Sequence, residues 1–215
     1  MSSTDFASLL CSRLCHDLVG PVGALYNGVE LLADETDPAM QARCLELLAD
    51  SARQTSNKLK FFRLAFGAAG GFGDDVDIRD AQSALEGLFA DRRVDIEWLV
   101  PNGALPKSAV KLLLNLAMTA GDALLRGGLL KVGADRRGAG VDLVVRAEGS
   151  RLLLDDELRA AMEGRTHPAD LSPRAAAAHL VRCLVEDAGA TLEIRQPEDG
   201  VLVFGVALPG ASAAA

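Results

Sequence analysis

Residues 14–21 read LCHDLVGP, and they place a histidine beside an aspartate in a stretch with helical periodicity. Neutral imidazole is a nucleophile at neutral pH, and it forms covalent intermediates in enzymes. An adjacent carboxylate can fix the tautomer of the ring and stabilise positive charge on it. His16 is therefore a candidate for a covalently modified residue, and Asp17 is a candidate for the group that orients it.

A metal site is the first alternative, because Cys11 and Cys15 lie one helical turn apart and directly precede His16. However, His16 lies about 100° around the helix from Cys15, and no second pair of ligands appears in the sequence. The cysteines also form no disulfide framework for a chain of this length. We therefore predict no metal bound by this chain, and free thiols that are buried or half-buried.

Two long helices joined by a short loop are expected to position the histidine. The first covers about residues 4–33 with Ser3 or Thr4 as its N-cap, and the second covers about residues 38–66 with Asp37 as its N-cap. The apolar stripe of the first helix consists of Leu14, Leu18, Val22, Leu25, Val29 and Leu32. A two-helix hairpin leaves much of such a stripe uncovered. We therefore predict a homodimer in which two hairpins form a four-helix bundle.

His16 lies two residues from both Leu14 and Leu18, so its side chain is expected to point away from the stripe. Glycine in a helix interior costs about 0.5–1 kcal/mol relative to alanine, and close approach of another surface would explain glycines beside the histidine. Pro21 should bend the first helix. Antiparallel pairing of the two helices places His16 beside about residue 55 of the second helix. A solvated surface with a chance histidine remains the alternative on spacing alone. The candidate partner-binding residues are Ser12, Arg13, Gly20, Gly23 and Asn27.

The sequence after the glycine-rich segment 67–73 alternates between helical and strand patterns. A turn at ADRRGAG and helical connections between strands predict a mixed sheet covered by helices on one face. We therefore predict an α+β protein with a helical hairpin domain at residues 1–68 and an α/β sandwich domain at residues 74–210. Helices are expected at about 79–91, 106–126, 155–163 and 172–188, and strands at about 94–100, 129–134, 141–148, 191–196 and 201–209.

Charge and hydropathy argue against several classes of partner. The net charge of -8 and the pI of about 4.9 disfavour direct binding to nucleic acid or to an anionic membrane surface. No apolar run approaches the roughly 20 residues that span a bilayer, and the N-terminal residues MSSTDFASLL do not resemble a secretory signal. We therefore expect a cytoplasmic protein.

The motif HDLVGPV at residues 16–22 resembles the phosphoacceptor box H-[ED]-[LIVM]-x-x-P-[LV] of bacterial histidine kinases. The second half of the chain resembles the ATP-binding domain of those kinases, which has the Bergerat fold. Asn115 matches the first asparagine of the kinase N-box, but Thr119 stands where the kinases hold Mg²⁺ with a second asparagine. Ala147 replaces the aspartate that reads adenine, and residues 171–177 replace the glycine-rich lid. The resemblance therefore implies a kinase-like scaffold that does not bind ATP.

A dimeric, kinase-like protein without an ATP site resembles the ChpT family of histidine phosphotransferases from alphaproteobacteria. The resemblance implies that His16 accepts phosphate from the receiver domain of a CckA-like hybrid kinase and passes it to CtrA- and CpdR-like response regulators that control the cell cycle. It implies no cofactor held by this chain, with Mg²⁺ supplied by the receiver. Gly20 stands where many kinases have a Thr or Asn that orients a hydrolytic water, which implies weak phosphatase activity.

Two other function classes stay open at this point. One is an active ATP-dependent histidine kinase with a divergent ATP site. The other is a non-enzymatic dimeric adaptor that binds receiver domains and blocks them.

Overall fold

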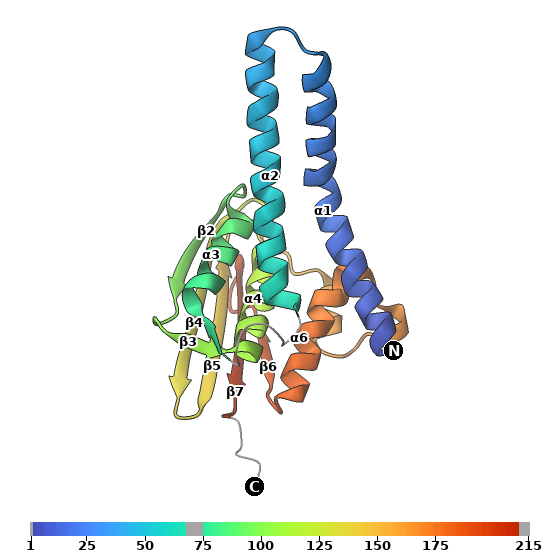
Figure 1. Cartoon of the computed structure of the whole chain (residues 1–215). Coiled ribbons are helices and arrows are strands. Elements are labelled where there is room, and N and C mark those ends of the chain that lie inside the picture. The colour runs from blue at the N-terminus through green and yellow to red at the C-terminus, as the bar shows by residue number, and fades with distance from the viewer. Residues whose placement is uncertain (1, 68–74, 211–215) are drawn as a thin grey trace.

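The computed structural model describes residues 2–67 and 75–210 (Figure 1). The predicted boundary between the two domains falls at residues 68–74, which lie outside these ranges. In chain order the elements are α1 (Ser3–Asp34), α2 (Pro38–Phe66), β1 (Asp75–Asp77), α3 (Ile78–Phe89), β2 (Val94–Leu99), β3 (Ala104–Pro106), α4 (Lys107–Asp122), β4 (Gly128–Arg137), β5 (Gly140–Glu148), α5 (Asp156–Met162), η1 (Pro168–Asp170), η2 (Pro173–Ala175), α6 (Ala176–Asp187), β6 (Leu192–Arg195) and β7 (Val201–Leu208).

The hairpin of α1 and α2 begins and turns at side-chain caps. The N-cap of α1 is Ser2, so the prediction of Ser3 or Thr4 was wrong. The Ser2 hydroxyl accepts a hydrogen bond from the Asp5 amide, and the Asp5 carboxylate accepts one from the Ser2 amide, which makes a capping box. The cap predicted for α2 is confirmed, because the Asp37 carboxylate accepts a hydrogen bond from the amide of Ala39.

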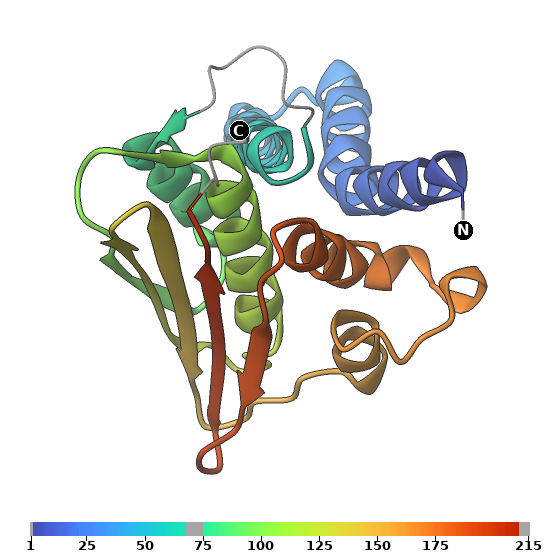
Figure 2. The ribbon, with the colours of Figure 1, turned by 90° about the horizontal axis from the view of Figure 1, so that it is seen from below.

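Helix α1 bends near Pro21, as the sequence predicts, and its N-terminal part leans away from α2 (Figures 1 and 2). That part packs against α6 and η2 in the C-terminal half. The ring of Phe6 meets the ring of His179 edge-on, with 5.2 Å between the ring centroids. The bend therefore brings the helix that carries His16 onto the C-terminal half of the same chain.

The large sheet has the strand order β2-β4-β5-β7-β6, in which β2 and β4 are parallel and the other neighbours are antiparallel. The main helices of this half cover one face of the sheet (Figure 2), which confirms the predicted sandwich. The small sheet formed by β1 and β3 was not predicted, because strands of three residues are too short to show a pattern. Helix α4 ends four residues earlier than predicted, since Gly127 and Gly128 turn the chain into β4 with positive φ.

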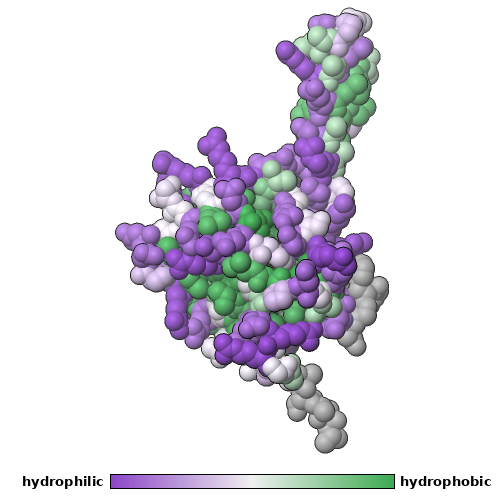
Figure 3. Space-filling model, turned by 90° about the vertical axis from the view of Figure 1, so that its left-hand side faces the viewer, coloured by the Kyte–Doolittle hydropathy of each residue, from purple (hydrophilic) through white to green (hydrophobic). Residues whose placement is uncertain are grey.

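The core lies between the sheet and α3, α4 and α6, and the C-terminal end of α2 belongs to it. Phe61 and Ala65 are fully buried there, and α2 packs against both α3 and α4. The far half of the hairpin protrudes from this core and leaves large apolar side chains exposed (Figures 1 and 3).

A glycine in α4 tests how tightly this core is packed. A Cβ atom at Gly121 would overlap the ring of Phe89, which is itself buried. Gly121→Ala is therefore expected to lower the free energy of unfolding by about 1–3 kcal/mol. Gly23→Ala in α1 is the matched control, because its Cβ would meet no described atom within 4 Å, and it should raise the free energy of unfolding by about 0.5–1 kcal/mol. Urea titrations at equal protein concentration measure both, and equal effects would contradict the prediction.

Candidate functional site

His16 lies on the outer side of α1, and its side chain is 85% exposed. Its Nδ1 atom lies 3.3 Å from Oδ1 of Asp17. An aspartate carboxylate accepts a hydrogen bond and cannot donate one, so this contact favours the tautomer with the proton on Nδ1. The lone pair of Nε2 is then available to a group that approaches from outside.

Asp17 is much less exposed than its neighbour, at 19%, and two groups hold it. Nε of Arg13, one turn earlier in α1, donates to Oδ2 of Asp17 at 2.7 Å. Nζ of Lys58 in α2 donates to the main-chain carbonyl of Asp17, also at 2.7 Å. Asp17 is therefore fixed through both its side chain and its main chain.

The contact of Lys58 follows from the proline in α1. The amide four residues after Asp17 belongs to Pro21, which has no N–H, so the Asp17 carbonyl lacks its helical partner. Lys58 supplies that hydrogen bond from the second helix. This contact brings Lys58 to the residue after His16, and Lys58 lies less than one turn from the predicted level of about residue 55. Lys58 could have been found from the sequence, because Pro21 leaves the Asp17 carbonyl without its helical partner and the polar stretch of α2 that contains Lys58 can supply a donor.

The predicted partner-binding residues divide into two groups. Ser12, Gly20 and Asn27 are exposed, and Gly23 is half-buried. A Cβ atom at Gly20 or Gly23 would meet nothing within 4 Å in the described parts of the chain. Arg13 differs, because its side chain is only 16% exposed and its guanidinium is engaged within the protein.

The positions that resemble nucleotide-binding motifs serve the packing of the fold. Asn115 is fully buried, and its Nδ2 donates to the carbonyls of Ala65 (3.0 Å) and Lys111 (2.8 Å), which ties the last turn of α2 to α4. Thr119 donates to the carbonyl of Asn115 at 2.9 Å. Ala147 is fully buried in β5, between β4 and β7.

The segment in place of the kinase lid is helical. Its Ser172 hydroxyl caps the 3-10 helix η2, and α6 follows directly. Four consecutive alanines at the junction of η2 and α6, Ala175–Ala178, are buried. This segment packs against α5 and α1, so its position in the sandwich is fixed by contacts on both sides.

Comparison with known proteins supports the resemblance that the sequence shows. The family model for the C-terminal domain of histidine phosphotransferases matches residues 78–200, which is more than half of the chain. The chain belongs to the histidine phosphotransferase family. Protein phosphotransferase ChpT of Brucella abortus (strain 2308) is 32% identical over 206 residues, which cover 94% of this chain and 95% of that protein.

One solved structure agrees with this assignment. A structure of a bacterial phosphotransferase superposes with a TM-score of 0.85 and 31% identity, covering 96% of this chain and 97% of the other. The histidine kinase AdeS of Acinetobacter baumannii matches with a TM-score of 0.49 and 12% identity, over 92% of this chain and 98% of the kinase chain.

The other histidines of this histidine phosphotransferase have structural surroundings. Nδ1 of His167 accepts a hydrogen bond from the amide of Ala169 at the start of η1. His179 packs against Phe6, and its Nε2 lies 3.5 Å from Sγ of Cys183. Burial lowers the pKa of His179 below its usual value, which fits a neutral packing residue.

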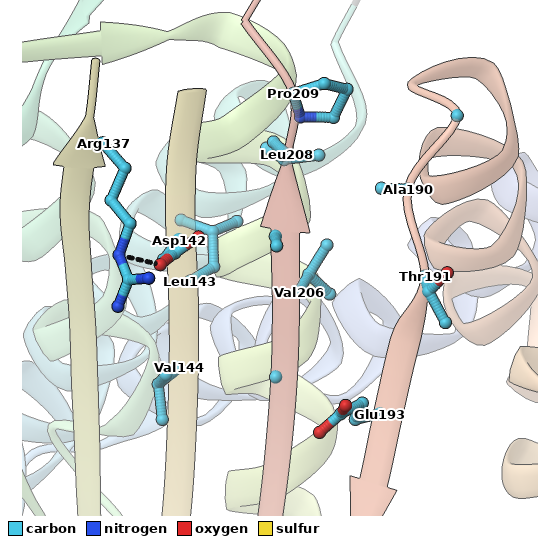
Figure 4. A pocket seen from close by; sticks show the side chains of 13 residues that line it. Arg137, Asp142, Leu143, Val144, Ala190, Thr191, Glu193, Val206, Leu208 and Pro209 are labelled. Atoms are coloured by element: carbon cyan, nitrogen blue, oxygen red, sulfur yellow. Dashed lines mark ion pairs between the residues drawn. The ribbon is translucent and has the colours of Figure 1, made fainter. Parts of the chain in front are cut away.

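A hollow on the uncovered face of the sheet lies beside the end of β7 (Figure 4). An ion pair between Arg137 and Asp142 at 2.6 Å lies at its edge, and Val144, Gly205 and Glu193 contribute to its lining. The phosphotransferase residues around His16 take no part in it.

The cysteines of the phosphotransferase differ in how far they are exposed. Cys11 and Cys15 are exposed, so the prediction of buried or half-buried thiols was wrong for them, whereas Cys44 and Cys183 are half-buried. Within residues 2–67 and 75–210, no three His, Cys, Asp or Glu side chains gather as metal ligands would. None of the described helices is long and apolar enough to cross a membrane.

Proposed function

We propose that His16 is the phosphoacceptor of a phosphorelay, taking a phosphoryl group from one receiver domain and passing it to another. The observation that carries this proposal is the exposed His16 ring, whose Nδ1 faces the fixed carboxylate of Asp17. Membership of the phosphotransferase family makes phosphoryl transfer the chemistry to expect. We propose a CckA-like donor and CtrA- and CpdR-like acceptors, which the resemblance of the sequence to the ChpT family implies.

The proposed reaction has two in-line steps. Nε2 of His16 attacks the phosphorus of the donor's aspartyl phosphate, the N–P bond forms, and the P–O bond to the donor aspartate breaks to leave its carboxylate. Nδ1 keeps its proton, and Asp17 stabilises the positive charge on the ring. The carboxylate of the acceptor then attacks the same phosphorus, and the electrons of the N–P bond return to Nε2. Positioning supplies most of the rate in such transfers, and Mg²⁺ comes with the receiver.

We also propose that the C-terminal half does not bind ATP. Thr119 is buried and bonded to the main chain, and Ala147 offers a buried methyl group where a nucleotide-binding domain of this type has a carboxylate. Backbone amides of a flexible glycine-rich loop suit phosphates, whereas Ala175–Ala178 are packed and helical. The phosphoryl group must then come from another protein, and we propose that this exchange takes place in the cytoplasm.

We further propose that the chain works as a homodimer through the protruding hairpin. Val22 and Val29 of the predicted stripe are 47% and 59% exposed in the single chain, and Leu59 of α2 is 51% exposed. Figure 3 shows apolar side chains gathered along one side of this hairpin. A second copy of the same surface would cover them, as in a four-helix bundle.

Transfer from a phosphorylated receiver tests the proposed function. A purified receiver carrying labelled phosphate is mixed with the protein, and the expected result is an acid-labile label that maps to the peptide containing His16. A parallel sample receives labelled ATP and no receiver. Label from ATP alone would identify an active kinase, and receiver binding without any label on this chain would identify an adaptor. Either result would contradict the proposal.

A small residue beside His16 gives a second test of receiver docking. Gly20→Leu is expected to reduce phosphotransfer about ten-fold or more, because the new side chain fills space that a receiver needs and misplaces the reacting groups. The fold should tolerate it, since a Cβ at Gly20 meets no atom of the described residues within 4 Å. Transfer kinetics and a denaturant titration measure the two effects. Ala42→Leu, at an exposed site on α2 near the hairpin tip, is the control, and an unchanged rate for Gly20→Leu would contradict the prediction.

A further inference from the structure

Arg13 joins the phosphoacceptor helix to the C-terminal half of the chain. Besides its contact with Asp17, its Nη2 lies 3.7 Å from Oδ2 of Asp122. Its Nη1 donates to the main-chain carbonyl of Arg174 at 3.3 Å. Each of the three guanidinium nitrogens thus has a partner within the chain, and the side chain is only 16% exposed.

The two groups that hold Arg13 are themselves fixed. Asp122 is the last residue of α4, and its Oδ1 also accepts from Nη1 of Arg92 at 2.6 Å. Arg174 lies in η2, the segment that stands in place of the kinase lid, and its own guanidinium pairs with Asp155 at 3.0 Å. Asp122 is therefore shared between two arginines, and the carbonyl of Arg174 belongs to a packed turn.

A chain of contacts thus runs from the sandwich to the phosphoacceptor, from Asp122 through Arg13 and Asp17 to His16. Asp17 and Arg13 are both shielded from solvent, so their ion pair is less screened than a surface pair. Without Asp122, Arg13 would lose its second carboxylate and lie near the positive charge of Arg92 with no shared anion between them. Arg13 would then be free to change its position relative to Asp17.

We propose that Asp122 is a positioning residue for the phosphoacceptor, acting together with the Arg174 carbonyl to fix Arg13 and so to hold Asp17 against Nδ1 of His16. This inference rests on the proposed function, because it takes His16 as the reacting group. It gives the C-terminal half a role in phosphotransfer that needs no nucleotide. It also reassigns Arg13, which the sequence suggested as a partner contact, to orientation within the chain.

The test is Asp122→Asn in the full-length protein, because asparagine keeps the shape and removes the charge. Two quantities are measured: the single-turnover rate of phosphotransfer at saturating donor receiver, and the tautomer of His16 from ¹⁵N chemical shifts of its ring. We expect the saturated rate to fall about ten-fold, the Nδ1-protonated tautomer to lose its preference, and the receiver concentration at half-saturation to stay within about two-fold. Asp142→Asn, which removes the same charge from an ion pair at the far end of the sheet, should change neither quantity.

A double-mutant cycle keeps the proposal testable if Asp122→Asn also loses stability. Arg13→Gln should reduce the saturated rate at least as much as Asp122→Asn, and the double variant should be no slower than Arg13→Gln alone. Independent, additive losses would overturn the proposal. So would an unchanged tautomer and rate in Asp122→Asn, or a rise in half-saturation alone, which would make this cluster a docking surface. If the wild-type protein accepts no phosphate at all, the proposed function fails instead, and the two failures are distinguished.

Discussion

Replacing His16 by alanine is expected to abolish acceptance of phosphate from a receiver, and with it all onward transfer. The ring nitrogen is the nucleophile of the proposed reaction, and neither of the other two histidines lies beside Asp17, since His167 contacts Ala169 and His179 contacts Phe6. The rate should fall by about a thousand-fold or more, to the background of the assay. The measurement is the amount of labelled phosphate on the protein after it is mixed with a phosphorylated donor receiver. The label that reaches the acceptor receiver is measured in the same way.

The matched controls are the other histidines of the chain. His167→Ala removes an exposed ring that only accepts a local main-chain hydrogen bond, and it should leave transfer unchanged. His179→Ala removes a packing residue, and it should lower stability more than activity. The side chain of His16 contacts Asp17 and is otherwise mostly solvated, so His16→Ala should fold as the wild type does. Transfer that persists in a folded His16→Ala protein would refute the phosphoacceptor assignment.

The sequence predicted the parts of the fold that depend on local patterns. The stripe of α1, the Asp37 cap and the alternation of strands in the sandwich can all be read from neighbouring residues. Ser2, and not Ser3 or Thr4, is the N-cap of α1, because only Ser2 exchanges hydrogen bonds with Asp5. The predicted end of α4 was too late, because the helical pattern of the sequence continues past Asp122. In both places a turn or a cap decided the boundary, and periodicity alone does not show it.

Only the part of the candidate site that lies on α1 could be predicted from the sequence. His16 and Asp17 stand side by side in the sequence, and helical spacing predicts the outward direction of the ring. Lys58 and Asp122 contact this pair or its partner Arg13 from other elements. Their contribution depends on the bend at Pro21 and on the packing of α1 against α6 and η2, which are tertiary features. Helical spacing alone therefore could not separate Arg13 from the outward-facing partner candidates.

The second large effect is expected for Val29→Glu, which should convert the proposed dimer into a monomer. Val29 lies on the predicted stripe of α1 and is 59% exposed in the single chain. Burying a valine stabilises an interface by about 1.5–3 kcal/mol, and burying an unpaired carboxylate costs several kcal/mol more. A two-fold dimer carries the substitution twice. The dimer dissociation constant should therefore rise by about a thousand-fold or more, as measured by sedimentation equilibrium.

Leu31→Glu is the control for this substitution, because Leu31 is equally exposed but lies on the side of α1 that carries His16. It adds the same charge to the same helix, and it should leave the dimer intact. The groups that we propose to orient His16, namely Arg13, Asp17 and Lys58, all come from one chain. The His16 tautomer should therefore survive in the Val29→Glu monomer. A Val29→Glu protein that remains dimeric would place the dimer interface elsewhere, and a monomer with an altered tautomer would show that the second copy helps to build the site.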